Sequence, residues 1–151
     1  MKLEYLMTYR AELKPPVEVG AGPFGRRSIF DVTGGRAEGP RLRGKLLASG
    51  GDWLLVDAHG TGYLDVRGTL ETDDGARIYI HYHGVLEINQ KILSALSRGE
   101  ETDYGDTYFM TQPRFETGDP RYEWVNRIVA VAEGRVLPGA VEYRVYQAVN
   151  G

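Results

Sequence analysis

The chain has 151 residues, of which 42% are hydrophobic and 26% charged, and its formal net charge is -3. It contains no cysteine, which excludes disulfide frameworks, thiolate nucleophiles and cysteine-ligated zinc. The basic residues do not form the patch typical of nucleic-acid-binding proteins, and no apolar run approaches the ~20 residues of a membrane-spanning helix. The N-terminal residues lack the apolar core of a signal peptide. We therefore expect a single cytoplasmic domain, residues 1–151, without nucleic-acid or membrane partners.

Along most of the chain, apolar residues alternate with polar ones, and glycines and prolines interrupt the alternation at short intervals. This pattern is typical of short β-strands joined by turns. In chain order, it predicts strands at residues 2–13, 26–32, 40–48, 52–57, 62–88 as two runs, 107–117, 122–136 and 140–149. Asp74-Gly75 joins the two runs of 62–88 and predicts a hairpin turn, because both residue types tolerate a positive φ.

Residues 89–100 depart from this alternation. Ile92, Leu93 and Leu96 share one face of a predicted helix, and Gly99 is suited to end it. Many short strands with one helix predict an all-β protein, a single antiparallel β-barrel of roughly eight to ten strands. Closure is favoured because long strands rich in Tyr, Val and Ile would aggregate through bare edges. The interior of such a barrel is either filled by side chains or left as a cup.

The long hairpin has one polar face and one apolar face. Asp65 and Arg67 lie on the polar face of its first strand, and His81 and His83 share one face of its second. The apolar face carries residues such as Val66 on the first strand. Polar side chains turned outward into water and polar side chains turned into the lumen are both compatible with this pattern.

His81 and His83 form a His-x-His pair, a spacing that can bring two imidazoles to one metal ion. A metal site needs at least one more ligand, for which His59 or a carboxylate is a candidate. Two histidines on a half-polar strand are more often ordinary strand residues, so we expect no metal. A single histidine acting as a general base is an alternative, because its usual pKa is near neutrality.

Residues 113–126, "PRFETGDPRYEWVN", concentrate charged and aromatic side chains. The Gly-Asp-Pro segment is a turn signal and predicts a hairpin that brings Arg114 and Glu116 across from Trp124 and Asn126. These side chains form either a solvated ion pair worth a few tenths of a kcal/mol, or one wall of a pocket that combines aromatic and polar groups.

Several of these motifs resemble the bacterial domain-of-unknown-function family 3237, also called uncharacterised protein family 0311. They are Gly-Gly-Asp-Trp at 50–53, Asp-Val-Arg at 65–67, and Phe-Glu-Thr-Gly at 115–118 followed by Trp-Val-Asn at 124–126. The resemblance extends from about residue 3 to residue 146. It implies a small antiparallel β-barrel, often oligomeric, and brings no established reaction. The positions that match the family motifs are Asp52, Asp65, Arg67, Arg114, Glu116 and Asn126.

The sequence favours a small cofactor-free enzyme that performs acid–base chemistry, of the isomerase, lyase or cyclase type, on a hydrophobic or aromatic carbonyl-bearing metabolite in the lumen. A non-catalytic small-molecule carrier and a structural protein without a pocket are the alternatives, and a homodimer or higher homo-oligomer is expected. The candidate catalytic residues are Asp52, Asp65, Arg67, Arg114 and Glu116, and the candidate substrate-binding residues are Trp53, Tyr79, His81, Tyr82, His83, Trp124 and Asn126.

Overall fold

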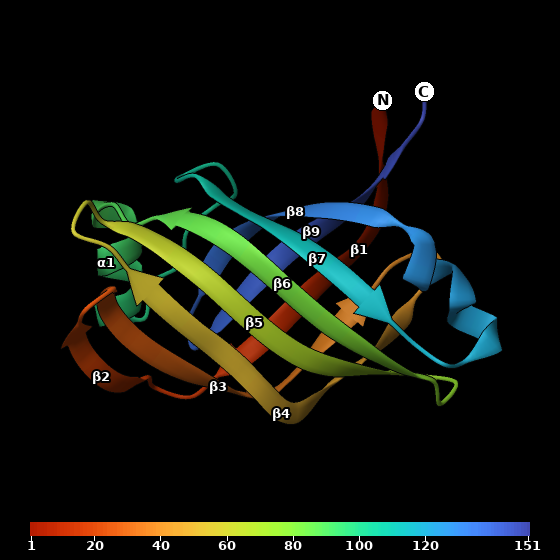
Figure 1. Ribbon diagram of the computed structural model, residues 1–151, viewed down its shortest axis with the longest axis horizontal. Helices are drawn as coiled ribbons and strands as arrows, with labels where there is room; N and C mark the ends of the chain where they lie inside the picture. Colours follow the sequence, from red (N-terminus) through yellow and green to blue (C-terminus); the bar gives the residue numbers. More distant parts are fainter.

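The computed structural model describes residues 1–151, and its nine strands belong to one antiparallel sheet. Their order is β1-β9-β8-β7-β6-β5-β4-β3-β2, and β1 also pairs with β3, so eight strands close into a barrel and β2 extends from β3. The predicted β-barrel is therefore confirmed (Figure 1). The strands are β1 (Lys2–Leu13), β2 (Val17–Gly22), β3 (Gly25–Glu38), β4 (Arg43–Val56), β5 (Thr61–Thr72), β6 (Arg77–Glu87), β7 (Phe109–Glu116), β8 (Val129–Leu137) and β9 (Ala140–Val149).

Two helices lie at opposite ends of the barrel (Figure 1). The helix α1 (Gln90–Arg98) matches the helix expected within residues 89–100. Asn89 caps it by accepting a hydrogen bond from the Ile92 N–H at 3.1 Å, and Gly99 ends it in the left-handed conformation with φ 65°. Neither helix has the length and apolar character that a membrane-spanning helix requires.

The 3-10 helix η1 (Pro120–Arg127) lies where the sequence predicted the second strand of a hairpin. The prediction is wrong here because Gly-Asp-Pro starts a helix rather than a tight turn. Asp119 accepts the Arg121 N–H at 2.9 Å, and Pro120 occupies the first turn, where its missing N–H costs nothing. The next strand, β8, consequently begins only at Val129.

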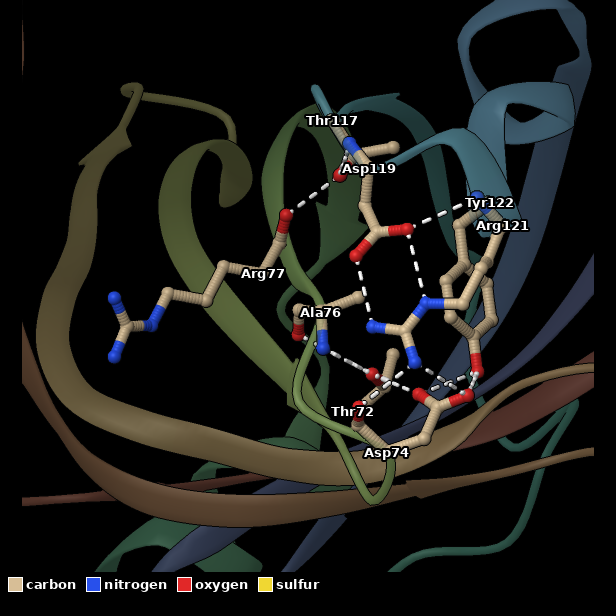
Figure 2. A network of polar contacts seen from close by, with 8 residues as sticks. All are labelled: Thr72, Asp74, Ala76, Arg77, Thr117, Asp119, Arg121 and Tyr122. Carbon is tan, nitrogen blue, oxygen red and sulfur yellow. Dashed lines mark hydrogen bonds and ion pairs between the residues drawn. The ribbon is translucent and has the colours of Figure 1, made fainter.

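Arg121 and Tyr122 fasten η1 to the β5–β6 turn (Figure 2). The Tyr122 hydroxyl lies 2.9 Å from each carboxylate oxygen of Asp74, which also accepts the Thr72 hydroxyl at 2.6 Å. Arg121 pairs with Asp119 at 2.9 Å and donates to the Asp74 carbonyl oxygen at 2.9 Å. These contacts hold η1 beside the β5–β6 turn at one end of the barrel.

Side chains fill the half of the lumen next to η1. Leu42, Leu70, Ile78 and Val125 are each exposed by 1% or less there. At roughly 1.5–3 kcal/mol for each large aliphatic side chain buried, this packing outweighs the polar alternative for the same strand faces. The apolar strand faces therefore point inward.

Candidate functional site

The other half of the lumen, next to α1, holds a cavity of about 500 Å³. Of its 29 lining residues, 21 are hydrophobic. Its walls come from the α1-facing ends of the strands, and Leu93 and Leu96 of α1 line it while remaining 49% and 54% exposed. The exposed residues 14–16 also line it, so the cavity reaches the surface between α1 and the β1–β2 connection.

Two carboxyl groups line this cavity, Asp52 and Glu18. Glu18 lies at the mouth, and Asp52 lies deeper in the lumen. Its Oδ1 accepts the backbone N–H of Asp65 at 3.1 Å, and its Oδ2 has no hydrogen-bond partner in the protein. Burial raises the pKa of Asp52 to about 7, the Asp65 N–H acts in the opposite direction, and the negative charge of Asp65 adds to the rise. A carboxyl group with this pKa exchanges protons readily at neutral pH.

A bulge in β4 precedes Asp52. Between the pairs Leu46–Leu70 and Gly50–Gly68, β4 contains two more residues than β5. Gly50 has φ +103°, and a Cβ atom there would lie 2.1 Å from the Arg67 carbonyl oxygen, so only glycine fits. After the bulge, Asp52 faces the lumen and Trp53 faces outward with 39% exposure.

Three tyrosines form an aromatic cluster at one end of the cavity. Tyr82 and Tyr143 line it, with ring centroids 5.3 Å apart, and Tyr9 stacks on Tyr143 at 5.9 Å. Burial holds the pKa values of all three phenols well above their usual range, so each stays protonated at neutral pH. The buried Tyr9 hydroxyl has no hydrogen-bond partner in the protein. The floor of the cavity therefore carries phenol donors beside a single carboxyl group.

At the mouth, Glu18 accepts the Ser28 hydroxyl at 2.6 Å. This hydrogen bond joins β2 to the inner face of β3 and fixes one side of the opening.

A model of the family described as "Protein of unknown function (DUF3237)" matches residues 1–148. The chain belongs to this family. The resemblance identified in the sequence is thereby confirmed. A curated UPF0311 protein of Rhodopseudomonas palustris is 30% identical, with 99% of this chain and 97% of that protein covered. A curated UPF0311 protein of Clostridium acetobutylicum is 30% identical, with 97% and 94% covered.

Solved structures share the fold of this DUF3237 protein. A β-barrel-like protein from Acinetobacter baumannii is 38% identical with a TM-score of 0.83, covering 97% of this chain and 94% of that one. The conserved protein of unknown function from R. palustris has a TM-score of 0.90 at 31% identity, covering 99% of both chains. A protein described as an enzyme from Penicillium herquei has a TM-score of 0.71 at 21% identity, covering 97% and 92%.

Of the residues proposed from the sequence, Asp52 and Tyr82 lie in the cavity. The polar strand faces point outward, which leaves most of the other proposed residues outside the lumen. The residues on the outer wall are Trp53, Asp65, Arg67, Tyr79, His81, His83, Arg114 and Glu116. This outward placement corrects the lumenal constellation of carboxylates and arginines on which the sequence-based mechanism depended.

The remaining two proposed residues lie in η1, at the closed end. The side-chain amide of Asn126 accepts the Thr117 N–H at 2.8 Å and donates to the Thr117 carbonyl at 3.0 Å, so it fastens the connection after β7. The indole of Trp124 packs against the core and lies under the Arg41 guanidinium, 3.7 Å from its ring centroid. Both side chains therefore have structural contacts in this protein.

The cavity is also lined by Tyr143, Phe30 and Phe109, which were not predicted from the sequence. A signal for Tyr143 was present, because it shares one face of the last predicted strand with the apolar Val141 and Val145. An apolar strand face can serve either as filling or as a wall, and alternation alone does not distinguish the two. Charged residues are the more conspicuous signal of a site, and here they lie on the other face.

Proposed function

We propose that this protein is a small cofactor-free enzyme that transfers protons within a hydrophobic or aromatic carbonyl-bearing metabolite, in an isomerase, lyase or cyclase type of reaction. The observation that carries this proposal is Asp52, a carboxyl group with a pKa of about 7 inside an apolar cavity. A protein that only binds such a ligand has little use for a carboxyl group perturbed in this way.

In the proposed reaction, the Asp52 carboxylate removes a proton from the substrate through Oδ2, the oxygen without a partner in the protein. The same group, now protonated, returns the proton to another atom of the substrate, so no external acid or base is consumed. The phenols of Tyr82 and Tyr143 stay protonated and can donate hydrogen bonds to an oxygen that gains negative charge. The surrounding apolar walls strengthen these interactions by excluding water.

The cavity also indicates the class of substrate. A volume of about 500 Å³ lies in the range of small-molecule sites, and the walls offer few polar partners. Arg67 and Arg114 lie on the outer wall, so neither can neutralise a negatively charged ligand in the lumen. A largely uncharged ring system with one or two oxygens is therefore the best match.

Hydrogen–deuterium exchange tests the proposal with probe molecules in place of the natural substrate. The protein is incubated in D2O with a panel of aromatic ketones and phenols, and exchange at carbon is followed by NMR. We expect at least one probe to exchange, and Asp52→Asn to slow it about 10²–10⁴-fold, the usual contribution of a general base. Glu116→Gln is the matched control, because Glu116 lies on the outer wall and its loss should change nothing.

The alternatives give different results in this experiment. Probes that bind in the cavity without any exchange would support a carrier and contradict the enzyme. Probes that neither bind nor exchange would favour the structural role. Exchange that persists in Asp52→Asn and disappears in Glu116→Gln would move the chemistry to the outer wall.

A homo-oligomer remains part of the proposal, as does a cytoplasmic location. Only one edge of β2 is paired, to β3, and the β2 region leaves Val17, Val19 and Phe24 exposed by 60%, 64% and 77%. A free apolar edge is suited to pairing with the same edge of a second copy. We expect light scattering to give at least twice the mass of the chain, and Val19→Lys to reduce it to that of the monomer. A wild-type monomer would contradict this.

A further inference from the structure

Asp65, His81 and His83 form a cluster on the outer wall of the barrel, on the opposite side of the strands from the cavity. Asp65 pairs with His83 across β5 and β6, and His81 lies two residues away on the same face. Oδ1 of Asp65 lies 3.1 Å from Nε2 of His81 and 3.6 Å from Nε2 of His83. One atom from each residue lies within 4.8 Å of the others.

We propose that these three residues bind a divalent transition-metal ion, Zn²⁺ in the first instance. Nitrogen and oxygen ligands bond Zn²⁺ at about 2.0–2.2 Å, which in tetrahedral geometry places neighbouring ligand atoms about 3.3–3.6 Å apart. The two Asp65–histidine separations already lie close to this range. The His83 side chain is 68% exposed and free to rotate, so the remaining separation can close without moving the backbone.

This arrangement supplies the ligand that the His-x-His pair lacked. The sequence left the third ligand open between His59 and a carboxylate, and the strand register selects Asp65. His59 lies in the turn between β4 and β5 and does not belong to the cluster. Two imidazoles and a carboxylate are a common set of zinc ligands, and water would complete the coordination from the solvent side.

The neighbouring contacts hold the ligands in place. The His81 ring stacks on Tyr79, with centroids 6.3 Å apart and planes at 29°, and it meets the His83 ring at 4.8 Å. The Asp65 backbone N–H is fixed by Asp52. Asp65 and His81 are therefore ordered before the metal binds and lose little conformational freedom, so that mainly His83 has to adjust.

Two arginines oppose the binding of a cation. Arg67 on β5 and Arg114 on β7 are the cross-strand neighbours of His81, one on each side. Neither arginine forms an ion pair within 4.0 Å. At the protein surface their repulsion is weakened by water and salt. The arginines therefore lower the affinity without removing the site, and replacing one of them should raise it.

Titration calorimetry with ZnCl₂ tests the site on the full, untagged chain after treatment with a chelator. The chain suits this experiment because it contains three histidines and no cysteine, so few other residues compete for zinc. We expect one site per chain. Asp65→Asn and His83→Ala should each weaken binding by at least about 10–100-fold, the loss usual even for residues that only support a ligand. Arg67→Gln should strengthen binding.

His59→Ala is the matched control, and it should leave zinc affinity unchanged. Co²⁺ provides a second readout, because its visible absorption should appear in the wild type and in His59→Ala and disappear in His83→Ala. The proposal is overturned if the wild type binds no zinc, if His83→Ala binds as well as the wild type, or if His59→Ala loses the site. Each outcome leaves the lumenal proposal unaffected, because the zinc titration involves no lumenal ligand.

Discussion

Asp52→Asn is expected to stabilise the protein at pH 8 by roughly 2–4 kcal/mol, and to leave it nearly unchanged below pH 4. The reason is the difference in the pKa of Asp52 between the folded state, about 7, and the unfolded state, 3.8. Between these values the folded protein holds a proton that the unfolded chain has lost. The wild type therefore loses stability as the pH rises from about 4 to about 7, and asparagine, which cannot ionise, removes that loss.

Urea denaturation of both proteins across this pH range measures the effect. Asp57→Asn is the control with the opposite sign. Asp57 accepts the backbone N–H groups of His59 at 2.9 Å and Thr61 at 3.0 Å, and these hydrogen bonds lower its pKa. Its contribution to stability is present at neutral pH and disappears as the pH falls through that lowered pKa, so Asp57→Asn should destabilise the protein at pH 8. A stability difference for Asp52→Asn that does not depend on pH would disprove the buried, perturbed carboxyl group.

Gly50→Ala is expected to destabilise the protein by about 3–5 kcal/mol, one of the largest effects of a single substitution. Its new Cβ atom would lie 2.1 Å from the Arg67 carbonyl oxygen, which is backbone and cannot move aside. Alanine is also strained at φ +103°. The β4 bulge would have to rearrange, and Asp52 would shift with it. Thermal unfolding measures the loss of stability.

Gly75→Ala separates the two causes. Gly75 has φ +92° in the β5–β6 turn, and a Cβ atom there meets nothing within 4 Å. This substitution introduces the backbone strain without the collision and should cost only about 1–2 kcal/mol. Equal losses at the two glycines would contradict the close approach of β4 to β5 at the bulge.

Much of the fold was predictable from the sequence, because period-two alternation reports strands directly. The Asp74-Gly75 turn and the helix ended by Gly99 follow from local backbone preferences. The errors lie where a tertiary feature overrides the pattern. The two strands predicted at 40–48 and 52–57 belong to a single strand, β4, because its glycines form a bulge rather than a loop. The unpredicted β2 depends on its pairing with β3 rather than on its own residues.

The candidate site was harder to predict, because the alternation of polar and apolar residues defines the two faces of a strand but does not show which face points into the barrel. The polar face of β5 and β6 carries Asp65, Arg67 and the histidines, which suggests a site. Burying the apolar face is more favourable, so this polar face lies outside the barrel. Asp52 was identified correctly as a lumenal residue, but with partners that lie on the other side of the wall. Its pKa could not be foreseen, because burial depends on residues distant in the sequence, such as Tyr82 and Tyr143.

The two ends of the barrel differ in a way that dictates how a ligand must travel. The η1 end is packed solid, so a molecule that enters beside α1 has to leave by the same route. Asp52 lies four residues from the end of β4, about 13 Å along the strand from the entrance. Only the leading edge of a bound molecule reaches it, whereas the trailing edge stays near Leu93 and Leu96. Such a blind tube would distinguish its ligands by what they carry at one tip and would tolerate wide variation at the other.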